Sequence, residues 1–443
     1  MKRFLFLLLA AILVLLTPQY TEIIQANPMP TQLRVGLVDR FGGRDAIHIN
    51  NTSIMLGHTY LQSANGFTVR PYGSHEAALY DGSHRLQIFD SQTQIRDAYD
   101  GMIRLDSVSY RGAVMFARLG GQGITAVNIL GLEEYLFSVV PSEMPATWHQ
   151  EALRAQAVAA RTYALRILNH GSPHTGFDLC DRVCCQVYRG TEREHENSTQ
   201  AVLATAGLAA YFNGQLIDAV YFASSGGMTE NSENVWQEAR PYLRSVSDPH
   251  EFEPVTWTRT FTLTEITNLL SHNNRFIGNA TGMAIGGTHP SGRVESLVIH
   301  GTNGQAVLTR EEIRTFFSSS AEGSLMSRHF TLGGSQVSAA AADVVVSDGV
   351  QQINLSAIGL HGINAQGAIS TMVTFNATDG LSTVIYGPAN PQLMATTGDT
   401  IVITGRGFGH GVGMSQRGAE GMARNGYGFR EILTHFYTGI VIH

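Results

Sequence analysis

A glutamate between two prolines is the first group whose position suggests catalysis. Glu143 is the central residue of the string PSEMP (141–145), and apolar Val139 and Trp148 lie close to it in the sequence. Apolar surroundings disfavour a charged carboxylate, so burial raises the pKa of such a group. A general acid needs a raised pKa to work near neutral pH. Glu143 is therefore a candidate acid, although a glutamate in this setting is more often a cap or an exposed first-turn residue.

Arg161 is the second candidate for chemistry. It lies in an Ala-rich stretch between Ala160 and Ala164, which predicts a closely packed helix face. A guanidinium group can hold a carboxylate or a sugar oxygen with its planar fork of N–H donors. Arg161 is thus expected either to act in the site or to form a structural ion pair on a half-buried helix.

The three cysteines lie within six positions of one another and close to a histidine. His174, Cys180, Cys184 and Cys185 together supply the Cys3His set that zinc accepts in tetrahedral sites. Adjacent cysteines rarely both reach one metal, so a near-vicinal disulfide is the rival interpretation. An odd cysteine count cannot be fully paired within one chain. The nearby groups that can substitute for a ligand are His170, His195 and Asp178.

Two glycine-containing strings indicate places where the backbone can come very close to another group. Glycine occupies every second position from Gly405 to Gly413, which allows contact with a ligand or a neighbouring strand. The polar groups that this loop and the preceding SSGG string can present to a substrate are Arg406, His410, Gln416, Ser224 and Ser225. The alternative for the loop is a tight packing connection, with Ser415 as the N-cap of the next helix.

Composition excludes several function classes. The chain has 443 residues, of which 43% are hydrophobic and 15% charged, and its net charge is −7. A nucleic-acid-binding protein needs a basic surface, which this charge does not supply. The glycine loop does not fit a dinucleotide fingerprint or a P-loop, and no HExxH or GxSxG string is present.

The first 26 residues predict export from the cytoplasm. Lys2 and Arg3 precede an unbroken apolar run over residues 4–16, and a cleavage site fits residues 24–26. This is the pattern of a signal peptide. The apolar run is shorter than the roughly 20 residues of a spanning helix, and retention as an uncleaved anchor is the alternative. We expect an extracytoplasmic protein, secreted or anchored by this segment.

The remaining chain predicts an α+β fold. Residues 27–130 form a β-rich N-terminal part, because short apolar runs alternate there with Gly, Asn and Asp turns. Residues 131–443 form the catalytic part, with an inserted β-rich segment at about 321–404. A first helix is expected to end at Val140, before the two prolines. The Ala-rich helix over residues 151–168 is expected to be central and to carry the active site, followed much later by the glycine loop.

Several strings, taken together and in order, are familiar. They are VPSEMPATWHQEALRAQAVAARTYAL, CDRVCCQVYRGTE, ASSGGMTENSENVW, PYLRSVSD, SGRVESLVIHG and GRGFGHGVGMSQRGAEGMARNGYGFREILTHFYTGI. Over residues 33–443 the chain resembles the stage II sporulation protein D family, which also includes amidase-enhancer proteins of the cell wall.

The resemblance implies a peptidoglycan lytic transglycosylase, which cuts the bond between N-acetylmuramic acid and N-acetylglucosamine and leaves anhydro-muramoyl ends. It implies Glu143 as the catalytic acid and Arg161 as a second active-site residue. This chemistry requires no cofactor. Some members bind zinc, and the matching positions are His174, Cys180 and Cys185, with Cys184 where such members tend to carry histidine.

The resemblance also implies partners and a second hypothesis. Glycan strands are the expected substrate, and a cell-wall amidase and a membrane protein are the expected partners in sporulation and engulfment. The alternative function is a non-catalytic cell-wall module that enhances an N-acetylmuramoyl-L-alanine amidase.

Overall fold

The protein is described here from a computed structural model. The structure describes residues 32–333 apart from Gly120 and Gln122, residues 400–443, and the backbone of three strands between 344 and 376. The predicted α+β class is confirmed, since helices and several sheets occur along the chain. The predicted signal segment lies outside the described residues. Within the described part, no helix combines the length and apolar character needed to cross a bilayer.

Two sheets form the N-terminal part. One has the strand order β13-β1-β12-β11-β8-β3-β4 and the other the order β10-β9-β2-β5-β6-β7. Both are largely antiparallel, and β12 is buried over all but its last residue because it lies between β1 and β11. The strands are β1 (Gln32–Gly36), β2 (Ile47–Ile49), β3 (Ser53–Leu56), β4 (Thr59–Gln62), β5 (Phe67–Tyr72), β6 (Glu76–Asp81), β7 (His84–Phe89), β8 (Ile95–Asp97), β9 (Met102–Leu105), β10 (Val108–Arg111), β11 (Ala113–Ala117), β12 (Thr125–Gly131) and β13 (Leu179–Cys180).

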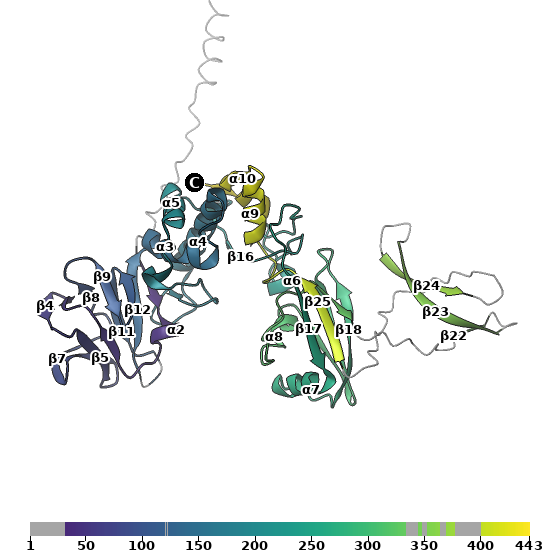
Figure 1. Cartoon of the computed structure of the whole chain (residues 1–443), viewed down its shortest axis with the longest axis horizontal. Helices are drawn as coiled ribbons and strands as arrows, with labels where there is room; N and C mark the ends of the chain where they lie inside the picture. Colours follow the sequence, from purple (N-terminus) through teal and green to yellow (C-terminus); the bar gives the residue numbers. More distant parts are fainter. Residues whose placement is uncertain are drawn as a thin grey trace, which may run out of the picture.

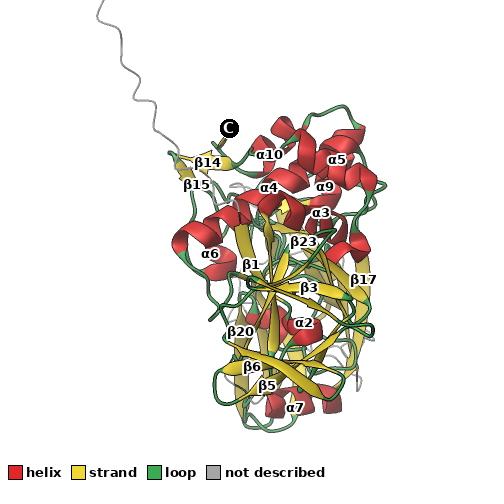
Figure 2. Cartoon of the chain, turned by 90° about the vertical axis from the view of Figure 1, so that its left-hand side faces the viewer, coloured by secondary structure: helices red, strands yellow, loops and turns green. Residues whose placement is uncertain are grey.

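A group of helices lies at one end of these sheets (Figure 2). Its members are α3 (Leu132–Glu143), α4 (Gln150–His170), α5 (Glu196–Ala204), α9 (Gln416–Arg424) and α10 (Phe429–Phe436). As expected, the Ala-rich helix α4 is central, and it contacts the other four. Its alanines, including Ala157 and Ala160, are fully buried, because small side chains let neighbouring helices approach closely.

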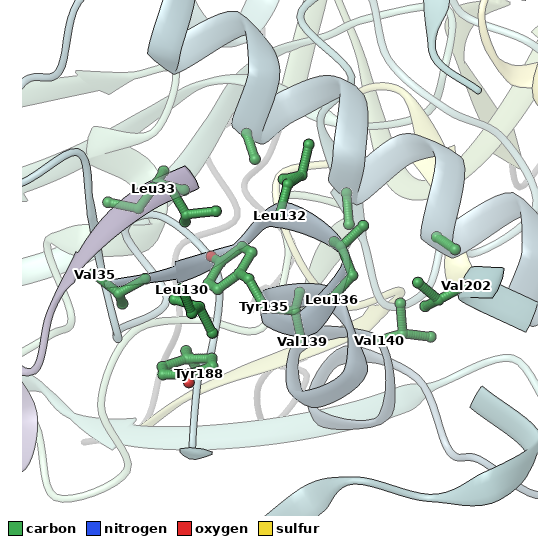
Figure 3. Close-up of a cluster of buried hydrophobic side chains, with 14 of the residues drawn as sticks. Leu33, Val35, Leu130, Leu132, Tyr135, Leu136, Val139, Val140, Tyr188 and Val202 are labelled. Atoms are coloured by element: carbon green, nitrogen blue, oxygen red, sulfur yellow. The ribbon is translucent and has the colours of Figure 1, made fainter. Parts of the chain in front are cut away.

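One hydrophobic core joins the N-terminal strands to these helices. Leu33 and Val35 of β1 lie in the same buried cluster as Tyr135 and Leu136 of α3 (Figure 3). The cluster extends to Ile432 on α10, near the end of the chain. The predicted boundary at 130/131 therefore does not separate two cores, because α3 follows β12 directly and packs back onto the sheet.

Helix α3 runs further than the prolines suggest. It continues through Pro141 to Glu143, whereas the sequence predicted an end at Val140. Pro141 lacks the N–H that would bond back to the preceding turn, and the helix ends two residues after it. The Ser142 hydroxyl donates to the Ser138 carbonyl at 2.7 Å. Met144 then leaves the helix with an extended backbone. The catalytic candidate is thus a helix-end residue.

A second core belongs to a separate lobe (Figure 1). Strand β25 (Thr400–Arg406) lies between β17 and β21, so the returning chain closes this lobe. Its other elements are β17 (Thr256–Thr262), α7 (Leu263–His272), β18 (Ala280–Thr288), β19 (Val294–Gly301), β20 (Gly304–Thr309), α8 (Glu312–Thr315) and β21 (Phe330–Gly333). The predicted inserted strands are present as an antiparallel set of β22 (Val344–Ser347), β23 (Gln352–Ile363) and β24 (Ile369–Asn376).

Short pairings tie the C-terminus to the middle of the chain. Strand β16 (Tyr221–Phe222) pairs in parallel with β26 (Met414–Ser415), which places the glycine loop beside the SSGG string. The remaining short elements are α2 (Val38–Phe41), the 3-10 helix η1 (Gly190–Arg193), β14 (Ala210–Phe212), β15 (Gln215–Leu216), α6 (Glu233–Trp236) and β27 (Val441–Ile442).

Candidate active site

Glu143 lies at the end of α3 and is held at a fixed position. The Val187 backbone N–H donates to its Oε1 at 2.8 Å, and the Gln416 side chain also hydrogen-bonds to it. Burial raises the pKa of Glu143 above its ordinary value, and these two hydrogen bonds oppose the shift only in part. A partly buried carboxyl that retains its proton more easily than a free one has the property of a general acid.

The carboxyl faces a pocket of about 290 Å³. Six separate segments of the sequence build its walls, so the pocket exists only in the folded chain. The lining residues are Glu143, Tyr163, Val183, Cys184, Cys185, Val220, Tyr221, Trp236 and His410. The Ala-rich helix α4 contributes Tyr163 to the wall, and Glu143 lies at the end of the preceding helix α3, in the proline-bounded string that the sequence indicated.

The His/Cys group lies on one wall of this pocket. The ligand atoms of His174, Cys180, Cys184 and Cys185 lie within 4.8 Å of one another. The His174 Nε2 and Cys185 Sγ atoms are 3.1 Å apart, and the sulfurs of Cys180 and Cys184 are 2.7 Å apart. These thiols are free, so the rival disulfide is not formed. The donor set fits one tetrahedral zinc ion, including both adjacent cysteines.

The glycine loop makes close contacts on both sides. Gly409 and Gly411 have positive φ, and a Cβ atom there would lie 2.7 Å from Phe222 and 2.4 Å from the Arg293 guanidinium. Only glycine satisfies both requirements. The loop pairs with the SSGG string through mutual Ser224–Phe408 backbone hydrogen bonds. This packing brings His410 to the pocket, and Ser415 caps α9 as predicted.

The other predicted substrate-binding residues divide into two groups. Gln416 is buried and contacts the acid itself, so its role is to hold Glu143. Ser224 and Ser225 do not face a cleft: both are buried, and their hydroxyls donate to the carboxylates of Glu251 and Asp248. They are structural because their donors are already used.

Arg406 is also placed away from the pocket. Its side chain is exposed, and its Nε donates to His329 Nε2 at 2.9 Å. It lies at the end of β25, four residues before the loop position that reaches the pocket. The predicted contact of Arg406 with substrate is therefore not supported by its position.

Arg161 forms a structural ion pair, which was one of its two predicted roles; the other was a role in the site. Its guanidinium is completely buried and makes a bidentate contact with Glu133, at 2.8 and 2.6 Å. Its remaining N–H groups donate to the carbonyls of Val202 and Leu208. Arg161 is not among the residues that line the pocket, so the structure places it in a supporting ion pair.

The sequence did not single out the aromatic walls of the pocket. Tyr163, Tyr221 and Trp236 line it, although each belongs to a different element. Trp236 is 41% exposed, which is unusual for so large an apolar side chain. Trp236 ends ASSGGMTENSENVW, one of the strings on which the family resemblance depends. That position was the feature of the sequence that could have indicated a role in the site.

Comparisons with known proteins agree with this geometry. A family model described as stage II sporulation protein matches residues 120–212, which contain Glu143, Arg161 and the His/Cys group. The class defined by fold and site is therefore that of a stage II sporulation protein.

Relatives extend the match over most of the chain. Stage II sporulation protein D of Bacillus subtilis is 30% identical over 333 residues, covering 72% of this chain and 76% of the relative. The amidase enhancer of the same organism is 30% identical over 407 residues, covering 89% of this chain and 53% of the relative. The Bacillus amyloliquefaciens stage II sporulation protein D is 28% identical over 333 residues, covering 72% of this chain and 75% of the relative. The chain belongs to the stage II sporulation protein D family.

Proposed function

We propose that the protein is a lytic transglycosylase that cleaves the N-acetylmuramic acid–N-acetylglucosamine bond of peptidoglycan strands. The observation that supports it is a single carboxyl group in a pocket that aromatic side chains line. Within the described part of the chain, Glu143 is the one carboxyl among the lining residues. Hydrolytic glycosidases use two carboxyl groups, about 5 to 9.5 Å apart.

A transglycosylase of this kind needs only one. The protonated Glu143 gives its proton to the leaving glycosidic oxygen as the bond to the muramoyl C1 breaks. The resulting carboxylate then accepts the proton of the muramoyl C6 hydroxyl while that oxygen attacks C1. The product is a 1,6-anhydro ring, the proton returns to Glu143, and no water is consumed. A pKa raised by burial favours the first step.

Digestion of purified glycan strands tests the proposal. Mass spectrometry is expected to find anhydro-muramoyl ends with the wild-type protein and none above background with Glu143→Gln. Reducing ends would instead indicate hydrolysis and contradict the proposed reaction. Equal anhydro products from both proteins would exclude Glu143 as the acid.

The similarity to an amidase enhancer favours a second candidate function. In that case the protein binds strands and stimulates a partner amidase without cleaving them. The same preparations can be added to an N-acetylmuramoyl-L-alanine amidase acting on cell walls. Full stimulation by Glu143→Gln, together with no anhydro product from the wild type, would favour the enhancer function.

We propose that the His/Cys group binds a structural zinc ion. His174, Cys180, Cys184 and Cys185 would hold it, and the ion would cross-link the loop that forms one wall of the pocket. When bound, zinc would neutralise thiolate charge and fix these ligands in place. The proposed reaction uses Glu143 alone and needs no metal chemistry.

Metal analysis tests this assignment without an activity measurement. We expect a single zinc ion per chain in the purified protein and almost none in Cys180→Ala. His170→Ala is the matched control, since His170 is exposed on α4 and bonds only to the Arg166 carbonyl. Chelation should lower the thermal midpoint of wild type and control but not of Cys180→Ala. Equal zinc content in all three proteins would contradict the ligand set.

The proposed substrate places the protein outside the cytoplasm, in the cell wall or anchored to the membrane by residues 1–26. The partners that follow from this proposal are peptidoglycan strands, a cell-wall amidase and a membrane protein. Fractionation with an antibody and cross-linking in intact cells would test location and partners.

A further inference from the structure

Trp236 has an unusual environment for a tryptophan. Its ring is 41% exposed, yet it lines the pocket that contains Glu143. The other two tryptophans are placed differently: Trp257 is 7% exposed within the second core, and Trp148 packs edge-on against Phe252 at 6.2 Å. An exposed indole that forms part of a pocket wall offers a large apolar surface to a ligand.

The segment that carries Trp236 is rigid although the ring is exposed. The Ser232 hydroxyl accepts hydrogen bonds from Arg240 N and Arg244 Nη2 and donates to the Glu238 carbonyl. Glu233 makes a two-point contact with the same Arg244, at 2.8 and 2.5 Å. These bonds close the loop on both sides of α6. Binding to a ring that is already held in place costs little conformational entropy.

His410 extends the same surface. Its ring centroid lies 4.9 Å from that of Trp236 and 5.5 Å from that of Phe222. The Val412 N–H donates to His410 Nδ1 at 3.1 Å, which assigns the ring proton to Nε2, and the Tyr221 backbone engages the ring as well. His410 therefore contributes a fixed ring whose polar atoms are occupied by backbone groups.

Burial, assisted by nearby positive charges, keeps the His410 ring neutral. Burial, together with the nearby guanidinium groups of Arg314, Arg293 and Arg328, lowers the pKa of His410 to about 3. A neutral imidazole can lie against the tryptophan without bringing an ionic charge into the pocket. The wall that Trp236 and His410 contribute to the pocket is thus aromatic and uncharged.

We infer that Trp236 and His410 form a stacking subsite for one sugar ring of the glycan strand. Pyranose rings present a face of C–H groups, and the electron-rich face of an indole attracts them while burying apolar area. Hydroxyl and amide groups around the edge of the sugar remain free to bond elsewhere. The identity of the sugar rests on the proposed function, whereas the stacking surface does not.

Binding can be measured without turnover. The full-length chain carrying Glu143→Gln is titrated with a peptide-free tetrasaccharide of alternating N-acetylglucosamine and N-acetylmuramic acid, and intrinsic fluorescence is followed. We expect binding to change the tryptophan emission. Adding Trp236→Ala should weaken binding about 10-fold, the range of a lost aromatic stacking contact, and should remove the emission change.

Two variants separate stacking from general damage. Trp236→Phe keeps an aromatic face and should retain affinity within about threefold, so a loss as large as that of Trp236→Ala would overturn the inference. Tyr99→Ala is the matched control, because Tyr99 is 76% exposed on the loop between β8 and β9 and does not line this pocket. Equal weakening by Tyr99→Ala would also overturn it, as would unchanged affinity in Trp236→Ala.

The kinetic readout distinguishes this inference from the proposed function. In a chain with Glu143 intact, Trp236→Ala should raise KM more than it lowers kcat, as expected for a contact present before the transition state. If Glu143→Gln cleaves strands normally while Trp236→Ala fails to bind them, the proposed acid is wrong and the subsite stands. If instead Glu143→Gln fails to cleave strands while Trp236→Ala binds them normally, the subsite is rejected and the proposed acid stands.

Discussion

Replacing Glu143 with glutamine should lower the rate of strand cleavage by about 100- to 10,000-fold, the usual contribution of a positioned general acid. Glutamine has nearly the same shape and can still accept the hydrogen bond from Val187 N, so the pocket should be preserved. It cannot donate a proton to a leaving oxygen as an acid does. The measurement is the initial rate of anhydro-muramoyl end formation with saturating strands.

The pH dependence of this activity follows from the burial of the carboxyl. Burial raises the pKa of Glu143, so the protonated form persists to higher pH than in a free glutamate. Cleavage should therefore decline as pH rises through that raised pKa. A decline in cleavage centred at the ordinary pKa of an exposed glutamate would contradict the assignment.

The substitution Glu143→Gln should change stability in the opposite direction to activity. The folded protein binds the Glu143 proton more tightly than the unfolded chain, so the contribution of this group to stability is lost as pH rises through the raised pKa. Above that pKa the buried carboxylate is destabilising, so Glu143→Gln should unfold there at a slightly higher urea concentration than wild type. Glu253→Gln is the control, since Glu253 is exposed and should change neither property.

The local sequence around Glu143 made it a candidate acid but did not indicate which groups hold its carboxyl. The apolar neighbours of the PSEMP string predicted a raised pKa, and the structure gives the same direction. Val187 and Gln416, which hold the carboxyl, lie 44 and more than 200 positions away. Contacts of such separation depend on the packing of α3, α4 and α9, which a local pattern does not encode.

The aromatic wall was missed for a related reason. A tryptophan at the end of a short helix is usually core, and nothing in residues 233–236 distinguishes an exposed ring from a buried one. His410 was predicted because the alternating glycines around it indicate a backbone that approaches other groups closely. Trp236, whose ring lies beside it, was not predicted. Ser224, Ser225 and Arg406 were predicted to bind substrate because polar groups near glycines suggested a ligand. In the structure their donors bond to the carboxylates of Glu251 and Asp248 and to the His329 ring.

Arg161 should prove essential for stability and not for substrate contact. Its completely buried guanidinium pairs with Glu133, whose side chain is 31% exposed, and satisfies two backbone carbonyls. Arg161→Met leaves the carboxylate and both carbonyls without their donors. Breaking a buried pair on one side commonly costs 3–5 kcal/mol, and the partial exposure of Glu133 reduces this to about 3 kcal/mol.

Urea unfolding of Arg161→Met and Arg154→Met provides the comparison that decides this role. Arg154 lies on the same helix and pairs with Glu151, but its side chain is 35% exposed, so its loss should cost only about 0.5 kcal/mol. The double variant Glu133→Leu with Arg161→Met should recover part of the loss, because it removes the unpaired charge. An Arg161→Met protein of normal stability with a greatly raised KM for strands would instead show that Arg161 reaches the substrate.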